Sequence, residues 1–289
     1  MTQQSHPGGT INTLTTIRTA NRLFGDLAPK LTAKLARRIL MTPHVPRARE
    51  WELGVLAEAQ PITFRFGLAG LRWGSHGPIV LLVHGWEGRP TQFAQLVAPL
   101  RAAGRQVIAI EAPAHGRSPG HESHVFAFTE ALLEVGAELR GVEAVVGHSM
   151  GGSAALLALA QGLQAERAVV LGSPASLARV LDRFAQALAL PPEARVEFLR
   201  LVDEHVGVPA ATLDVERLGA RLGLPGLVVH DHDDESVPFA EAEALARGWK
   251  GAQLVATNGL GHRRVLGDAG VVARVAEFLV GTPARLRAA

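Results

Sequence analysis

The five residues Gly147-His148-Ser149-Met150-Gly151 decide the fold that this sequence predicts. They follow a mostly apolar run at residues 142–146 and precede a pattern of small residues with helical spacing at 152–163. A strand, a sharp turn and a helix are therefore expected around Ser149. Glycines on either side let two backbones pass closely, so that the serine hydroxyl stands at the tip of a strained turn and faces a cleft. A nucleophile needs this arrangement.

A serine hydroxyl is a poor nucleophile near neutral pH, so it needs a histidine base and an acid that orients the histidine. Both follow Ser149 in the chain. An apolar run at 226–230 leads into a group of aspartates, and a second run at 253–256 leads into His262. The carboxyl ends of parallel strands share one edge of a sheet, so these side chains are expected to converge there. The aspartates are Asp231, Asp233 and Asp234.

Five motifs together make the chain resemble the α/β-hydrolase superfamily, in its serine-nucleophile, esterase-like or lipase-like branch with a small cap. The resemblance runs from about residue 80 to about residue 279. It implies an α/β fold with a mostly parallel, doubly covered sheet and a small helical cap insertion. The motifs are Leu82-Val83-His84-Gly85-Trp86, Ala112-Pro113-Ala114-His115-Gly116-Arg117-Ser118, Gly147-His148-Ser149-Met150-Gly151, Asp234-Glu235-Ser236-Val237-Pro238 and Gly261-His262.

The resemblance also implies the residues of the site. The catalytic triad falls on Ser149, Asp234 and His262. The oxyanion hole falls on the backbone N–H groups of Trp86 and Met150. Such a site hydrolyses a carboxylic ester, or a related acyl bond, through an acyl-enzyme intermediate. The expected partner is a small-molecule acyl substrate, and the chemistry requires neither a metal nor an organic cofactor.

The acid is the least settled member of this triad. Asp234 is favoured by its spacing to Val237-Pro238, and Asp231 and Asp233 remain alternatives. Exchanging each aspartate for asparagine distinguishes them, because the true acid should be the most damaging loss.

The remaining histidines near the motifs have plainer interpretations. His84, His115 and His148 are expected to hold loops in place rather than to carry protons. His230 and His232 stand beside the aspartates, but their spacing matches no standard ligand pattern, so no metal site is expected.

One loop departs from the family pattern. Many members read Asp-x-Pro-Gly-His-Gly where this chain has Glu111-Ala112-Pro113-Ala114-His115-Gly116. The alanine at position 114 could change the backbone of that loop, on which the triad itself does not depend.

Composition fits an enzyme of this kind. An apolar fraction of 47% in 289 residues supports a sizeable core, and we expect one sheet domain with an insertion. The chain has no cysteine, which excludes disulfides and thiolate chemistry. Its pI of 9.6 accompanies a formal charge of only +2, because without Tyr and Cys little titrates between histidine and lysine. No basic stretch is interleaved with aromatic residues, so a nucleic-acid partner is not expected.

Targeting signals are weak. The first residues do not have the pattern of a signal peptide, and no apolar run approaches the roughly 18 residues of a membrane-spanning helix. A cytoplasmic location is expected, and the oligomeric state is left open.

Short apolar runs alternate with helical patterns along the chain, which predicts right-handed crossovers and helices on both faces of the sheet. The core is therefore expected to comprise residues 61–175 and 223–289. Its strands are expected at 79–83, 107–110, 142–146, 168–171, 227–230 and 253–256, after an antiparallel pair within 62–73. Its helices are expected at 93–103, 124–139, 151–163, 239–247 and 265–279.

Two segments lie outside this core. Residues 1–60 are expected to form an N-terminal helical extension, with helical spacing over 12–40 and a break at Gly25-Asp26. Residues 176–222 carry two or three helical patterns and, by the resemblance, form a cap over the active site. Helices packed away from the cleft are the alternative. The leucine face and basic rim of the first helices could rest on an anionic membrane surface, although packing against the protein itself is the commoner fate.

Other activities stay open on this fold. The same triad serves thioesters, amides, lactones and carbon-carbon bonds beside a ketone, and the fold can also act as a non-catalytic ligand-binding module. A serine at position 149 argues against the branches that use an aspartate nucleophile on epoxides or haloalkanes.

Overall fold

The computed structural model describes residues 13–210, 214, 217–218 and 221–281. These residues form two compact units. The sheet unit takes its residues from 41–177 and 213–289, and the helical unit takes its residues from 1–40 and 178–212. The sequence-based scheme treats 1–60 and 176–222 as separate segments, whereas here most of the first segment groups with the inserted helices.

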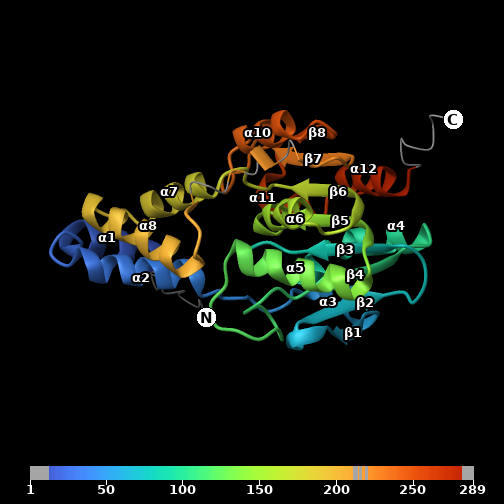
Figure 1. Cartoon of the computed structure of the whole chain (residues 1–289), viewed down its shortest axis with the longest axis horizontal. Helices are drawn as coiled ribbons and strands as arrows, with labels where there is room; N and C mark the ends of the chain where they lie inside the picture. Colours follow the sequence, from blue (N-terminus) through green and yellow to red (C-terminus); the bar gives the residue numbers. More distant parts are fainter. Residues whose placement is uncertain (1–12, 211–213, 215–216, 219–220, 282–289) are drawn as a thin grey trace, which may run out of the picture. The chain divides into compact units, whose positions relative to one another are not determined.

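An eight-stranded sheet forms the centre of the sheet unit, with strand order β1-β2-β4-β3-β5-β6-β7-β8 (Figure 1). The first two pairings, β1 with β2 and β2 with β4, are antiparallel, and all pairings from β4 to β8 are parallel. The strands are β1 (Gln60–Thr63), β2 (Ala69–Trp73), β3 (Ile79–Val83), β4 (Gln106–Ile110), β5 (Val142–His148), β6 (Ala165–Leu171), β7 (Gly226–Asp231) and β8 (Ala252–Thr257).

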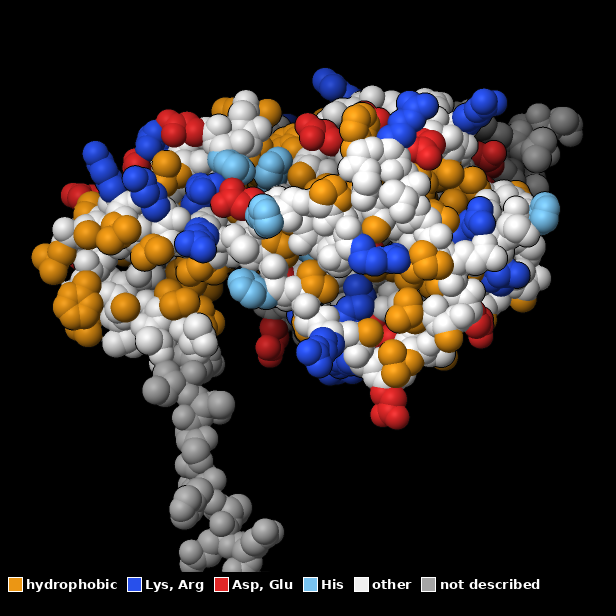
Figure 2. All heavy atoms as spheres, turned by 90° about the horizontal axis from the view of Figure 1, so that it is seen from below, with side chains coloured by type: hydrophobic (Ala, Val, Ile, Leu, Met, Phe, Trp, Pro, Cys, Tyr) orange, Lys and Arg blue, Asp and Glu red, His pale blue; other side chains and the backbone are white. Residues whose placement is uncertain are grey.

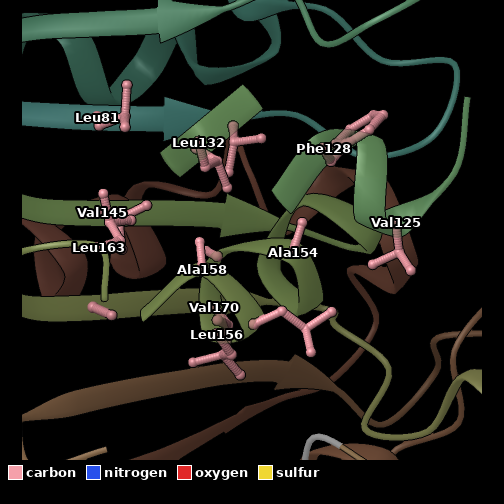
Figure 3. Packing of buried hydrophobic residues seen from close by; sticks show 14 of the residues in the cluster. Leu81, Val125, Phe128, Leu132, Val145, Ala154, Leu156, Ala158, Leu163 and Val170 are labelled. Atoms are coloured by element: carbon pink, nitrogen blue, oxygen red, sulfur yellow. The ribbon is translucent and has the colours of Figure 1, made fainter. Parts of the chain in front are cut away.

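Helices cover both faces of this sheet. Because successive residues of a strand point to opposite faces, each inner strand contributes side chains to two buried clusters. On β3, Leu81 and Val83 join the buried cluster formed with α5, α6 and α10 (Figure 3), whereas Val80 and Leu82 join the cluster formed with α4 and α12. The helical segments are α3 (Glu50–Ala57), η1 (Arg65–Gly67), η2 (Pro90–Phe93), α4 (Ala94–Ala102), α5 (Val125–Leu139), α6 (Met150–Ala160), α10 (Ala240–Gly248), α11 (Gly261–Arg264) and α12 (Ala269–Val280).

The predicted α/β fold and its strands are confirmed. Every strand expected between residues 79 and 256 is present, and the antiparallel pair expected within 62–73 is β1 with β2. The helix predicted at 265–279 begins later, at Ala269. Asp268 is the reason, because its side chain accepts the N–H of Val271 at 2.9 Å and so caps the helix at that point.

In the helical unit, the N-terminal segment contacts the inserted segment directly. Asn21 donates its side-chain amide to the carbonyl of Leu188 at 2.7 Å. The rings of Phe184 and Phe198 stack with centroids 5.7 Å apart. Its helices are α1 (Thr13–Phe24), α2 (Pro29–Met41), α7 (Leu177–Ala187) and α8 (Pro192–Val206). Within the described residues of the whole chain, no helix combines the length and the apolar character needed to cross a bilayer.

Candidate active site

Ser149 lies at the turn between β5 and α6 in a conformation that L-residues rarely adopt, with φ 53° and ψ −125°. Such backbone strain costs about 1–3 kcal/mol and persists where the surroundings hold it. Here the Ser149 N–H donates to the carbonyl of Leu171 at 2.9 Å, and its own carbonyl accepts the N–H of Gly152 at 3.0 Å. The strained serine is therefore fixed from both sides.

Two glycines allow the first turn of α6 to approach the neighbouring strands. A Cβ on Gly151 would lie 2.3 Å from the carbonyl oxygen of His84, and a Cβ on Gly152 would lie 1.9 Å from the hydroxyl of Ser173. Any larger residue at these positions would push the helix away from the ends of β3 and β6. The sequence signal for this close packing is the run of small residues that follows Ser149.

The expected oxyanion loop lies beside the serine. A Cβ on Gly85 would lie 2.8 Å from the Cβ of Ser149, so the chain that leads into Trp86 passes directly by Ser149. Met150 is the first residue of α6, where a backbone N–H has no acceptor within its own helix. The structure thus brings the segments that carry both predicted donors, Trp86 and Met150, to the same end of the sheet.

Buried His84 fastens this loop to the end of β4. Its Nε2 accepts the N–H of Ala112 at 3.1 Å, so its Nδ1 carries the proton and donates to the carbonyl of Gly85 at 2.7 Å. Burial, with a smaller contribution from the nearby His115, lowers the pKa of His84 to about 3. The ring is neutral and acts as a brace.

His115 makes a second brace of the same kind. Its Nε2 accepts the N–H of Glu87 at 3.1 Å, and its Nδ1 donates to the carbonyl of Pro113 at 2.9 Å. Burial lowers the pKa of this histidine as well. The adjacent Ala114 keeps a positive φ of 62°, so the loop holds the left-handed turn that the family glycine would favour.

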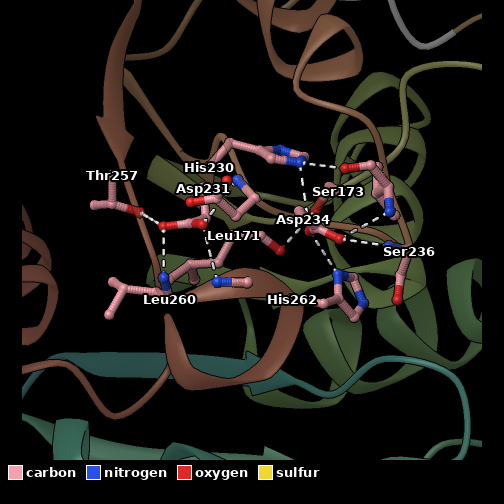
Figure 4. A network of polar contacts seen from close by, with 12 residues as sticks. Leu171, Ser173, His230, Asp231, Asp234, Ser236, Thr257, Leu260 and His262 are labelled. Atoms are coloured by element: carbon pink, nitrogen blue, oxygen red, sulfur yellow. Dashed lines mark hydrogen bonds and ion pairs between the residues drawn. The ribbon is translucent and has the colours of Figure 1, made fainter.

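Asp234 bonds directly to the predicted base (Figure 4). Its Oδ2 lies 2.7 Å from Nδ1 of His262, and its Oδ1 accepts the N–H groups of Ser236 and Val237 at 2.9 and 2.8 Å. Burial alone would raise the pKa of Asp234, but hydrogen bonds from His230, His262 and the Val237 N–H outweigh it and hold the pKa below its usual range. An ionised Asp234 fixes the proton of His262 on Nδ1 and leaves Nε2 as the acceptor.

The other two aspartates hold the loop that leads to the histidine. Asp231 accepts the Thr257 hydroxyl at 2.6 Å and the N–H groups of Leu260 and Gly261 at 3.1 and 2.9 Å. Asp233 accepts the N–H of Gly259 at 2.7 Å. These bonds lower the pKa of Asp231 despite its burial. Sequence reasoning weighed Asp231 and Asp233 only as alternative acids and missed this anchoring.

His148 connects the serine segment to the histidine segment. Its Nε2 donates to the backbone carbonyl of His262 at 2.8 Å, and the two rings lie 4.7 Å apart. Burial, and then repulsion by His262, lowers the pKa of His148 to about 3. The neighbour of Ser149 therefore contacts the predicted base through its backbone, a link that the sequence motif does not reveal.

The histidines near the aspartates make other contacts. His230 is fully buried, and its Nε2–H is shared between the carbonyl of Val237 at 2.8 Å and the more distant Oδ2 of Asp234 at 3.4 Å. His232 stacks on Phe239 with centroids 3.8 Å apart. Over the residues that the structure describes, no three His, Asp or Glu side chains gather in a group that could hold a metal ion.

A cavity of about 480 Å³ in the sheet unit is lined partly by residues that neighbour Trp86 and His262 in the chain. Glu87 and Arg263, which directly follow Trp86 and His262, lie in its wall. Its lining holds four arginines and three carboxylates, those of Glu52, Glu87 and Asp268, and Glu52 pairs with Arg89 at 2.9 Å, so a small excess of positive charge remains. The lining arginines are Arg49, Arg89, Arg263 and Arg264.

The parallel strands, the turn at Ser149 and the loops around it agree with a comparison to known protein families. Residues 80–275 match the alpha/beta hydrolase family. The chain belongs to the alpha/beta hydrolase family. Two relatives named below are esterases of this kind, and the protein is a hydrolytic enzyme.

Among known relatives of this alpha/beta hydrolase is a pimeloyl-[acyl-carrier protein] methyl ester esterase of Xanthomonas campestris, 30% identical over 238 residues that cover 68% of this chain and 93% of the relative. An esterase of Mycobacterium tuberculosis, Rv0045c, is 33% identical over 118 residues, or 39% of each chain. A crystal structure of a putative lipase from Acinetobacter baumannii superposes with a TM-score of 0.63 at 20% identity, covering 80% of this chain and 94% of that one. The last likeness concerns the fold.

Proposed function

We propose that this hydrolase is a serine esterase that cleaves a carboxylic ester through an acyl-enzyme intermediate. The observation that supports this best is the 2.7 Å hydrogen bond between Asp234 and Nδ1 of His262. It lies at the sheet edge where Ser149 occupies a strained turn. A histidine oriented by an acid, at the same sheet edge as a serine held in this way, is the arrangement that can activate a hydroxyl.

The proposed reaction begins with attack of the Ser149 hydroxyl on the ester carbonyl, while Nε2 of His262 accepts its proton. The negative charge that develops on the carbonyl oxygen is stabilised by the N–H groups of Trp86 and Met150, each worth about 10² to 10³ in rate in comparable sites. His262 then returns the proton to the leaving alcohol. Water attacks the acyl-enzyme by the same route and frees the acid, while Asp234 stabilises the charged ring at each stage.

The substrate class follows from the relatives only as a starting point. One relative is named as a methyl ester esterase, which makes methyl esters of carboxylic acids the first compounds to assay. The cytoplasmic location expected from the sequence remains part of the proposal, as does a small-molecule acyl partner.

The test is hydrolysis of p-nitrophenyl esters of graded acyl length by the wild type and by Ser149→Ala. Turnover by the wild type and its loss in the variant is the expected result, and Ser75→Ala, at an exposed position, controls for the exchange itself. Asp234→Asn should reduce kcat by about 10⁴, as the same change does in a serine protease. Activity that survives in Ser149→Ala would remove the serine from the mechanism.

A wild type that is inactive on every oxygen ester directs the next assay to thioesters and to carbon-carbon bonds beside a ketone, which the same groups can cleave. Inactivity on these as well would favour a ligand-binding module on the hydrolase fold.

A further inference from the structure

Helix α2 exposes three of its large apolar side chains, whereas Met41 at its C-terminal end is 1% exposed. Its inner face carries Ala33 and Ala36, which are 0% and 2% exposed, whereas Leu31, Leu35 and Ile39 keep 58%, 53% and 42% of their surface exposed. Residues four apart share one face of a helix, so these three side chains form a stripe. A helix in a globular protein ordinarily buries its leucines, and here small residues occupy the buried face instead.

Three more large apolar side chains, at the end of α1 and in the turn that leads to α2, are also exposed. Leu27 is 80% exposed, Phe24 is 61% exposed and Leu23 is 65% exposed. We call the six residues Leu23, Phe24, Leu27, Leu31, Leu35 and Ile39 the apolar ridge. Figure 2 shows hydrophobic side chains gathered on the helical unit, with Lys and Arg side chains near them. Exposed large apolar side chains in such a group are typical of an interaction surface.

The charges on the segment that carries the apolar ridge are mainly positive. Residues 13–41 contain six basic side chains and one acidic side chain, Asp26. Lys34 and Arg38 are exposed and directly precede Leu35 and Ile39, so they flank the ridge along α2. The six basic residues are Arg18, Arg22, Lys30, Lys34, Arg37 and Arg38.

This charge also acts on α8 of the same unit. The pKa of Glu197 lies below its ordinary value, chiefly because of its hydrogen bond from Arg200, and Lys30 and Lys34 contribute to the shift. The carboxylate of Glu197 is engaged directly by Arg200 at 2.7 Å, whereas Lys30 and Lys34 act on it through space.

We propose that the α1–α2 pair docks the enzyme on an anionic membrane surface. The apolar ridge enters the boundary between headgroups and acyl chains, and the flanking lysines and arginines face the lipid phosphates. A second copy of this chain fits the surface less well, because a two-fold contact would bring the same basic side chains together. An anionic bilayer supplies both an apolar layer and the opposite charge.

The test is vesicle flotation of the full-length protein with phosphatidylcholine alone or with a mixture of phosphatidylcholine and phosphatidylglycerol at about 7:3, a bilayer of moderate negative charge. The wild type is expected to float with the mixed vesicles, to stay behind with the neutral ones, and to be released as salt rises. Binding of Leu31→Ser with Leu35→Ser should fall by at least about tenfold for each leucine. Exchange of Lys30, Lys34 and Arg38 for glutamine should weaken it by about fivefold per charge.

Matched controls separate docking from general effects. Val196→Ser removes another apolar side chain of this unit, 70% exposed and outside the apolar ridge, and should float like the wild type. Arg65→Gln removes an exposed charge of the sheet unit and should also float. Because the ridge residues are exposed, Leu31→Ser with Leu35→Ser should keep the thermal unfolding temperature and the ester turnover measured without vesicles.

Wild-type protein that fails to float with the mixed vesicles would overturn the proposal, and so would flotation that the leucine exchanges leave intact. A dimer that these exchanges dissociate, seen by light scattering, would assign the ridge to a second copy and overturn it as well. None of these outcomes depends on esterase activity, so they are distinct from a failure of the proposed function.

Discussion

The backbone of Ser149 gives a stability prediction that separates strain from chemistry. Ser149→Ala and Ser149→Gly both remove the hydroxyl and should both be inactive. They differ at the Cβ, which alanine keeps and glycine lacks. With φ at 53° and ψ at −125°, the residue lies in a region that glycine enters freely and other residues enter at a cost.

The size of the effect follows from two opposing terms. Relief of the strain contributes about 1–3 kcal/mol to the glycine variant. The greater freedom of glycine in the unfolded chain removes about 0.5–1 kcal/mol. Ser149→Gly should therefore be more stable than Ser149→Ala by about 1.2 kcal/mol, the midpoint of a range that reaches about 2.5 kcal/mol. In a domain of about 150–250 residues, each kcal/mol moves Tm by about 2–4 °C, so Tm should rise by about 2–5 °C and by no more than about 10 °C.

Differential scanning calorimetry of the two variants at the same pH and concentration measures this difference. The control pair is Glu134→Ala and Glu134→Gly at an exposed position of α5, where the backbone is helical and glycine should lower the stability by about 1 kcal/mol. If Ser149→Gly melts at or below Ser149→Ala, the turn is not strained in solution and the reasoning fails.

Three further predictions concern the loops and the cavity. Asp231→Asn should lower kcat by about 10- to 100-fold, because the loop before His262 loses its carboxylate anchor, and a loss larger than that of Asp234→Asn would contradict the roles given to the two aspartates. Asp231 and Asp234 have lowered pKa values in the folded state, so the unfolded state binds protons on these carboxyls first as the pH falls. The contribution of these carboxylates to the free energy of unfolding should be fully present above about pH 5. It should decline on further acidification by at most about 1.4 kcal/mol per pH unit for each carboxyl. Urea unfolding between about pH 5 and pH 2.5 measures this slope, which should become shallower in Asp231→Asn and would refute the linkage if it did not. The arginines of the cavity should favour an ester that carries a carboxylate over its neutral isostere by about two- to fivefold in kcat/KM. Arg263→Gln should reduce this ratio, whereas the control Arg65→Gln should not. An equal ratio in the wild type and in Arg263→Gln would remove the cavity from substrate selection.

The sequence predicted the sheet well because its signals are local. Apolar runs such as 142–146 and 226–230 can be buried on both faces only as inner strands, and the structure contains them as β5 and β7. The order of the motifs was sufficient to place Asp234 and His262 at one edge, since parallel strands end there.

What the sequence could not predict depends on contacts between distant segments. The anchoring bonds of Asp231 join residues 26 to 30 positions apart, and no spacing rule distinguishes an acid that faces the histidine from one that holds its loop. The leucine stripe of α2 was expected to be buried in the protein. Its exposure accompanies the burial of Ala33 and Ala36 on the same helix, and a helical pattern alone does not show which face will be buried.

The bond from His148 to the carbonyl of His262 bears on attempts to engineer this enzyme. Position 148 is the variable residue of the G-x-S-x-G motif, and a designer would treat it as free to randomise. Here its ring hydrogen-bonds to the backbone of His262, so a library at this position should alter the placement of His262 as well as the shape of the turn. Segments exchanged with a relative should therefore carry residue 148 and the loop of residue 262 as one cassette.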